Sequence, residues 1–317
     1  MLAGRPKVAV LGAGATGAAT AHWLAAKEIA DVVLLDVADS MAQGKALDLY
    51  EAMPIEGLDV RVEGGGDYNL ARGADVVVIT AGVGRKPGQS RDDLLRVNYE
   101  IVATVAKQAY AVAPDAVYVV LTNPVDVLTY AVQHVTGLPH ARVFGQAGVL
   151  DSTRFRTFVA EAAGVSVEDV FCFVVGGHGD DMVPLVRYSS IGGMPLERFL
   201  TQEQIEAIVT RTRGGGGEIG GLLKTGSAFY APGAAIAAMT EAVIRDKKRV
   251  MPVVAHLDGM YGERDIYVGV PCIIGRGGVE KVLEVPFTTE ERAAFAKSVA
   301  SVRGPLAALG LGGGNGH

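Results

Sequence analysis

The stretch KVAVLGAGATG, residues 7–17, decides the fold. KVAVL is typical of a buried strand, and GAGATG fits G-x-G-x-x-G through Gly12, Gly14 and Gly17. A helix is predicted to follow near residues 15–27, which places the glycines in a strand-to-helix turn. In such a turn the backbone can approach a pyrophosphate, and the free N–H groups of the first helical turn can bind it. We therefore interpret six residues as a dinucleotide-binding loop: Gly12, Ala13, Gly14, Ala15, Thr16 and Gly17.

Asp36 supports this interpretation. It ends the next predicted strand, VVLLD at residues 32–36, and follows Gly17 by 19 residues. An acid at this spacing binds the ribose hydroxyls of a dinucleotide. Its charge would repel the 2′-phosphate of NADP, so the expected cofactor is NAD.

The first half of the chain alternates apolar strands with helices. Strands are predicted at 7–11, 32–36, 75–80 and 117–121, and helices near 15–27, 40–52, 92–112 and from Pro124 onward. Continuous apolar strands with helices between them are typical of a parallel sheet that is covered on both faces.

Beyond about residue 148 the pattern changes. It predicts a helix near 150–163, one long helical stretch over 202–247 and shorter strands near 250–285. The expected fold is therefore α/β: a Rossmann-type doubly wound parallel sheet over residues 1–148, followed by a mixed α+β substrate domain over 149–310. Residues 311–317 are predicted to be a disordered tail.

Composition excludes several classes of protein. The chain has 317 residues, and its 35 acidic and 29 basic side chains give a net charge of −6, whereas a nucleic-acid partner needs a basic face. No apolar run reaches the roughly 18 residues of a membrane span, and the N-terminus lacks a signal-peptide core. We expect a cytoplasmic protein with no membrane partner and no metal site. Cys172 and Cys272 are expected to be buried thiols.

Polar residues gather where predicted strands end, which is where open parallel sheets bind ligands. Asn123 follows VYVVL, and the glycine-rich loop 81–93 carries Arg85, Lys86 and Arg91. Taken alone this loop fits a solvated surface loop, but beside a cofactor it fits a mobile lid that brings positive charge to an anion. His178 lies in GGHGDD after the apolar run VFCFVV, with glycines on both sides.

Asp151 and Arg154 open the second part of the chain in DSTRFR, three residues apart, so on a helix they share a face. Taken alone they fit a surface ion pair. The other internal histidines, His22, His134, His140 and His256, are expected to be packed or surface residues.

These motifs together resemble a known family. GAGATG, LLD, AGVGRKPGQSRDDLL, LTNPVD, GQAGVLDSTRFR, GGHGDDMVPL and LLKTGSAFYAP occur in this order between residues 7 and 232. The set is similar to the malate dehydrogenases of the lactate-dehydrogenase-like group, whereas the C-terminal third carries little that is diagnostic.

The resemblance implies three catalytic residues. His178 would exchange a proton with the substrate, Asp151 would orient His178, and Arg91 would polarise the substrate carbonyl. General chemistry agrees, because oxidation of a 2-hydroxy acid removes a hydride and a proton, and histidine is the base whose pKa lies near neutrality.

The resemblance also implies binding residues. Arg154 would hold the carboxylate next to the reacting carbon, and Arg85 would contact the far end of the substrate. Asn123, joined to Pro124 by a cis peptide bond, would contact the substrate. Ser227 matches a substrate-side hydroxyl. Further cofactor contacts are implied for Asn98, Leu121, Thr122 and Asn123.

The function implied is the reversible, NAD-dependent oxidation of malate to oxaloacetate, a step of the tricarboxylic acid cycle, by a homodimer or homotetramer. Two alternatives stay open. Lactate dehydrogenase, or another 2-hydroxy acid dehydrogenase, would use the same histidine, aspartate and two arginines, although Arg85 favours a second carboxylate. A non-catalytic NAD-binding regulator would be expected to lack part of this set.

Overall fold

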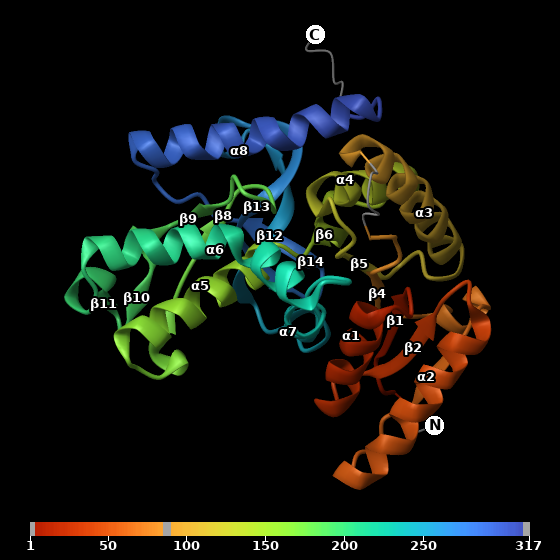
Figure 1. Cartoon of the computed structure of the whole chain (residues 1–317). Helices are drawn as coiled ribbons and strands as arrows, with labels where there is room; N and C mark the ends of the chain where they lie inside the picture. Colours follow the sequence, from red (N-terminus) through yellow and green to blue (C-terminus); the bar gives the residue numbers. More distant parts are fainter. Residues whose placement is uncertain (1–3, 85–89, 313–317) are drawn as a thin grey trace.

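A nine-stranded sheet runs through the computed structural model, which describes residues 4–84 and 90–312 (Figure 1). The strand order is β14-β13-β12-β6-β5-β4-β1-β2-β3. The parallel strands are β1 (Lys7–Leu11), β2 (Asp31–Leu35), β3 (Val62–Gly65), β4 (Val76–Ile79), β5 (Val117–Val120) and β6 (Val143–Gly145). In the centre, Val8 of β1 lies between Val32 and Val76, and all three side chains are buried. The strands are almost wholly apolar because helices cover both faces of the sheet.

The helices between these strands confirm the predicted α/β, Rossmann-type arrangement. They are α1 (Ala15–Ala26), α2 (Asp39–Ala52), α3 (Arg91–Val112) and α4 (Val125–Thr136). Local sequence sets their ends: the hydroxyl of Ser90 accepts the N–H of Asp93 at the start of α3, and Gly137 ends α4 in the left-handed region at φ 66°.

The last three strands differ from the prediction of shorter strands in a second lobe. They are β12 (Arg249–Asp258), β13 (Arg264–Gly275) and β14 (Gly278–Val282). With 10 and 12 residues, β12 and β13 are longer than the parallel strands, and they extend the large sheet in antiparallel fashion through the pair Val254–Gly145. Most of their apolar side chains are buried as in the parallel strands, so they continue the same core, although Val250 at the start of β12 is 45% exposed.

The remaining helices cover two cores: some pack on the core of the large sheet, and the others enclose a second, smaller core. These helices are α5 (Gly148–Ala163), α6 (Gln202–Leu223), α7 (Tyr230–Ile244) and α8 (Thr289–Ala308). Phe155 and Val159 of α5 pack in the smaller core with Ile205 and Ile208 of α6. The short strands of this region are β7 (Val170–Phe171), β8 (Val174–Val175), β9 (Val183–Pro184), β10 (Ser190–Ile191) and β11 (Met194–Pro195).

The single helical stretch predicted over 202–247 is wrong, because the structure divides it into α6 and α7. Lys224 and Gly226 adopt positive φ angles of 62° and 84°, which no right-handed helix contains. Pro232 lies in the first turn of α7, where its missing N–H costs nothing, so it suits the start of a new helix.

The turn that carries His178 connects β8 to β9 and is tied to the large sheet. Gly176 and Gly269 of β13 exchange two backbone hydrogen bonds, with N···O distances of 2.8 and 3.2 Å. A Cβ atom at Gly269 would lie 2.4 Å from the carbonyl oxygen of Gly176, so only glycine permits this approach. The turn is therefore anchored on the sheet on which the cofactor loop also lies.

The remaining sequence predictions concern the cysteines, two histidines, the C-terminal tail and membrane spans. Cys172 and Cys272 are buried free thiols, and His140 and His256 stack on each other with ring centroids 3.6 Å apart. Leu311, at the start of the predicted tail, is buried, whereas residues 313–317 lie outside the described residues. None of the helices seen over 4–84 and 90–312 is long and apolar enough to cross a membrane.

Candidate active site

The glycine loop joins β1 to α1 and has the geometry of a dinucleotide cradle. Gly12 has φ 109°, and its N–H donates to the carbonyl of Leu35 at 2.7 Å. A Cβ atom at Gly17 would lie 1.8 Å from the carbonyl oxygen of Gly12, so the turn closes only with glycine there. Gly14, at the N-cap of α1, leaves the first N–H groups of the helix without a side-chain acceptor. These N–H groups, at the positive end of the helix dipole, fit a pyrophosphate.

Asp36 follows β2 directly and lies beside this loop. One carboxylate oxygen accepts the N–H of Ala13 at 2.7 Å, and the other accepts the N–H of Ala38 at 2.9 Å. The two bonds hold the carboxylate at the rim of the glycine loop. A carboxylate at this place has lone pairs left for ribose hydroxyls and repels a phosphate.

The ends of β4 and β5 are joined by the buried side chain of Asn98, on α3. Its Oδ1 accepts the N–H of Val83 at 2.8 Å, and its Nδ2 donates to the carbonyls of Val83 and Asn123 at 3.2 and 3.0 Å. Both amide protons are thus used within the chain. Asn98 holds the base of the glycine-rich loop against Asn123, and its contact with a cofactor stays a prediction.

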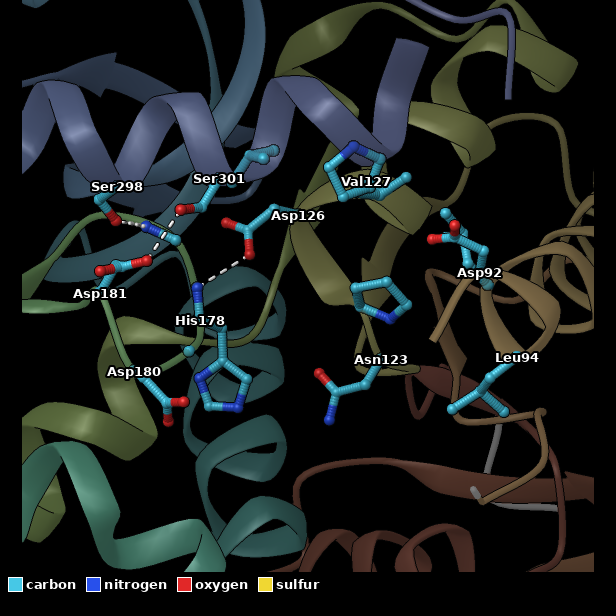
Figure 2. Close-up of a pocket in the computed structure, with 16 residues that line it drawn as sticks. Asp92, Leu94, Asn123, Asp126, Val127, His178, Asp180, Asp181, Ser298 and Ser301 are labelled. Carbon is cyan, nitrogen blue, oxygen red and sulfur yellow. Dashed lines mark hydrogen bonds between the residues drawn. The ribbon is translucent and has the colours of Figure 1, made fainter. Parts of the chain in front are cut away.

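Leu121, Thr122 and Asn123 leave β5 at the same edge. The hydroxyl of Thr122 donates to the carbonyl of Ala81 at 2.8 Å, and the N–H of Leu121 donates to Ile79 at 2.9 Å. The bond between Asn123 and Pro124 is cis, as predicted. Asn123 is exposed, and Figure 2 shows its amide and the imidazole of His178 projecting in the same direction.

His178, Asp151 and Arg154 form one hydrogen-bonded group. The Nδ1 of His178 lies 2.8 Å from Oδ2 of Asp151, and Nη1 of Arg154 lies 3.3 Å from Oδ1. The side chain of Asp151 is only 2% exposed, that of Arg154 10% and that of His178 17%. A carboxylate can only accept, so Nδ1 carries the proton and Nε2 is left for a substrate. Asp151 and Arg154, which taken alone fit a surface ion pair, are thus a buried pair in contact with a histidine.

The charge of this group decides the protonation of His178. Burial by itself lowers the pKa of the imidazole, but the charge and hydrogen bond of Asp151 and the charge of Asp126 together outweigh burial and the opposing charge of Arg154. The net effect raises the pKa of His178 above its ordinary value. A histidine held in this way can both give and take a proton near neutral pH.

A cavity of about 530 Å³ opens beside this group (Figure 2). Its wall includes Asn123, Asp126 and His178, together with Asp92 from α3 and Ser298 from α8. Over the described residues, no three His, Cys, Asp or Glu side chains are grouped in a way that could hold a metal ion.

Two residues that contact the site residues were not predicted from the sequence. Gly215 of α6 lies against Arg154, and a Cβ atom there would come within 2.2 Å of Cδ and 2.6 Å of Nε of the arginine. Asp126 accepts the backbone N–H of His178 at 2.9 Å. The run RTRGGGGEIGG could have indicated Gly215, because glycine destabilises a helix and so many glycines in one helix point to a close packing contact. For Asp126 the signal was a single acid in the apolar run VDVLTYAVQHV.

The described residues leave the predicted roles of three residues untested. Arg85 lies outside the described residues. Arg91 is the first residue of α3, but its side chain lies outside what is described. Ser227 is exposed between α6 and α7. Their roles stay predictions.

The fold and the site define a class of protein. A dinucleotide cradle lies at the end of β1, and a histidine backed by a buried aspartate and arginine lies at the second lobe, tied to the same sheet. A cradle of the first kind can bind a redox cofactor, and a group of the second kind can exchange a proton and offer a guanidinium to a carboxylate. This combination is that of a dinucleotide-dependent dehydrogenase for hydroxy acids.

Comparison with known proteins narrows the class. Residues 6–145 match the family model of the lactate/malate dehydrogenase NAD binding domain, and residues 148–307 match that of the lactate/malate dehydrogenase alpha/beta C-terminal domain. Malate dehydrogenase of Desulforudis audaxviator is 55% identical over 307 residues, covering 97% of this chain and 99% of that protein. The chain belongs to the lactate/malate dehydrogenase family, and NAD is its cofactor.

Solved structures show the same fold on both sides of this family. The malate dehydrogenase of Salinibacter ruber superimposes with a TM-score of 0.92 at 48% identity, covering 96% of this chain and 97% of that one. The lactate dehydrogenase of Cryptosporidium parvum, complexed with lactic acid and nicotinamide adenine dinucleotide, superimposes with a TM-score of 0.93 at 44% identity, covering 96% and 98%.

The contact between Gly215 and Arg154 generates a prediction. In Gly215→Ala the new methyl group displaces the Arg154 side chain, so we expect kcat/KM for the 2-oxo acid substrate to fall by about 10- to 100-fold, mainly through KM. Steady-state kinetics and the affinity for NADH measure this, and NADH affinity should hold.

Gly216→Ala is the matched control. The next residue of the same helix is exposed, and a Cβ atom there would meet no atom within 4 Å. This variant should keep the kinetics of the parent and gain about 0.5–1 kcal/mol in stability, because alanine is the better helix former. Equal kinetics in the two variants would show that Gly215 does not position Arg154.

Proposed function

We propose that this protein is an NAD-dependent malate dehydrogenase, which catalyses the reversible oxidation of (S)-malate to oxaloacetate. The observation that carries the proposal is the buried group in which Asp151 bonds His178 through one oxygen and Arg154 through the other. The curated relatives named malate dehydrogenase, at 52–56% identity over nearly the whole chain, support the choice of substrate.

The chemistry of oxidation assigns a task to each member of this group. Nε2 of His178 takes the proton of the malate hydroxyl as the C–H bond breaks, and Asp151 stabilises the imidazolium that results. NAD, when bound, accepts the hydride from the same carbon. The products are oxaloacetate, NADH and protonated His178, and the reverse reaction returns the proton.

Binding follows from the shape of the ionic groups. Arg154 presents a planar guanidinium, which suits the carboxylate next to the reacting carbon better than an ammonium group does. Asn123 projects beside His178 and would contact the substrate oxygen (Figure 2). Arg91 would polarise the carbonyl, and Arg85 would pair with the second carboxylate.

The choice between malate and lactate does not follow from the fold. The Cryptosporidium parvum lactate dehydrogenase superimposes as well as the malate dehydrogenases do. The preference for malate rests on the higher identity of the curated malate dehydrogenases and on Arg85, which a substrate with a methyl group would leave unpaired.

The cellular setting belongs to the same proposal. A malate dehydrogenase of this kind would serve the tricarboxylic acid cycle in the cytoplasm as a homodimer or homotetramer. Apolar side chains exposed on and near α2, among them Leu47, Tyr50 and Ile55, are compatible with a surface that another subunit covers.

The direct test follows NADH consumption with oxaloacetate and then with pyruvate. We expect kcat/KM for oxaloacetate to exceed that for pyruvate by at least about 100-fold, since an unpaired buried cation discriminates strongly. NADPH should be used less well than NADH because of Asp36. A preference for pyruvate would assign a lactate dehydrogenase, and NADH binding without any turnover would assign a regulator.

Replacement of His178 tests the mechanism. His178→Asn should lower kcat in both directions by about 100- to 10,000-fold while the affinity for NADH, measured by fluorescence, is kept. In the parent, oxaloacetate reduction needs protonated His178, so it should decline as the pH rises through the raised pKa. Malate oxidation needs the neutral form and should increase over the same range. Near-normal turnover of the variant is incompatible with the mechanism.

Replacement of Arg85 tests the specificity. Removing one partner of a desolvated charge pair costs about 2–5 kcal/mol. We expect Arg85→Gln to shift the oxaloacetate-to-pyruvate ratio of kcat/KM toward pyruvate by about 30- to several-thousand-fold. The loss for oxaloacetate should exceed the gain for pyruvate. A ratio within about tenfold of the parent's would mean that Arg85 does not contact the substrate.

A further inference from the structure

Asp126 is a buried acid that the proposed mechanism does not use. It lies in the first turn of α4, and only 4% of its surface is exposed. Its Oδ2 accepts the backbone N–H of His178 at 2.9 Å, and its Oδ1 is buried without a hydrogen-bond partner among the described residues. Burying a carboxylate with one oxygen unpaired is costly, so its presence beside the reacting histidine needs a reason.

The neighbouring amide shows that a charge is not needed to hold this turn. The N–H of Gly177 donates to the hydroxyl of Ser298 at 2.8 Å, so a neutral acceptor on α8 serves the adjacent position (Figure 2). Both acceptors are buried and both bond the same turn. Asp126 differs from Ser298 in that it can carry a negative charge. A comparison of the two residues can therefore separate the effect of anchoring the turn from the effect of the charge.

The charged groups around His178 show how a second carboxylate would affect the imidazole. Asp151 shares its charge between His178 and Arg154, and Arg154 lowers the pKa of the imidazole. Asp126 forms no ion pair with any described lysine or arginine side chain, so its charge is not offset in this way. Other charged groups at the cavity wall are Asp92 of α3 and, on the turn, Asp180 and Asp181, the last paired with Lys297 of α8 at 2.6 Å.

We infer that Asp126 is a positioning residue for the reaction at His178, because its carboxylate anchors the turn and supplies the second negative charge that stabilises the imidazolium. This inference rests on the proposed proton exchange at His178 and deepens it. Asp126 touches neither the reacting atoms nor the imidazole nitrogens in any hydrogen bond of the described residues; it acts through the backbone and through space. Consistently, burial raises the pKa of Asp126 to about 6, while the N–H and the charge of His178 oppose that rise.

The test measures the protonation of His178 itself. Histidine-labelled protein saturated with NADH is titrated by NMR, and the spectrum of His178→Asn identifies the His178 signal. In Asp126→Asn the acceptor is kept and the charge is lost, so we expect the midpoint of His178 to fall by on the order of 0.5–1 pH unit. The alkaline decline of oxaloacetate reduction should move by the same amount, which makes turnover roughly three- to tenfold slower above the midpoint.

Two variants separate charge from anchoring. Ser298→Ala removes the neighbouring anchor without a change of charge, and its His178 midpoint should stay within about 0.2 units of the parent's. Asp126→Glu keeps the charge and should restore most of the parent's midpoint. Equal midpoints in Asp126→Asn and the parent, or equal displacements in Asp126→Asn and Ser298→Ala, would overturn the inference.

The reciprocal measurement needs no Asp126 variant and decides the matter if Asp126→Asn does not fold. With ¹³C-labelled aspartate carboxyl groups, a buried signal in the parent should titrate near pH 6 and shift upward in His178→Asn, which lacks the imidazolium. An unchanged midpoint rejects the inference. If the parent turned over no 2-oxo acid while these shifts occurred, the proposed function would fail and the electrostatic role of Asp126 would stand.

Discussion

The buried charge of Asp151 is the constraint on which the site depends. Its side chain is almost fully removed from water, and a buried carboxylate that loses a partner is strongly destabilising. Three separate elements must therefore agree in position. The first turn of α5 carries Asp151, the β8–β9 turn brings Nδ1 of His178 within 2.8 Å, and α6 leaves room for the Arg154 side chain only because residue 215 is glycine. The same bonds that satisfy the carboxylate fix the tautomer of His178 and the direction of Arg154.

A chain of polar contacts along the strand ends connects this group with the cofactor loop. The hydroxyl of Thr80, after β4, donates to the carbonyl of Gly12 at 3.0 Å, and Asn98 bridges the next loop to Asn123. Asp126, one turn further along, bonds the backbone of His178. The carboxyl ends of neighbouring parallel strands meet at one edge, so residues far apart in sequence form a continuous frame. Hydride and proton transfer need the cofactor and the histidine at a defined separation, and this frame provides the means to keep it.

The parts of this arrangement that could be predicted are those with a local signature. The glycine loop and Asp36 follow from spacing within one βαβ unit, and His178 is marked by its glycines. Asp126 and Ser298 could not be assigned to His178 and Gly177, because these partners lie 52 and 121 residues away; the single acid in the apolar start of α4 indicates a buried charge but not its partner. The prediction of one helix over 202–247 is wrong for a local reason. Lys224 has a positive φ, and a lysine in the sequence does not indicate that conformation. The place of β12 and β13 in the large sheet depends on pairing with β6, which periodicity cannot reveal.

Malate and lactate share the atoms at which the reaction occurs, which explains how one fold can serve both substrates. Malate and lactate are identical at the carboxylate, the hydroxyl and the reacting carbon, and in the proposed function the group of His178, Asp151 and Arg154 acts on these shared atoms. None of its hydrogen bonds can therefore distinguish the two acids, which agrees with the near-equal superposition of malate and lactate dehydrogenases on this chain. Discrimination must come from a residue that faces the atoms in which the acids differ. In the proposed function that residue is Arg85 of the glycine-rich loop, so a change of substrate preference would leave the carboxylate, the imidazole and the guanidinium that act on the shared atoms unchanged.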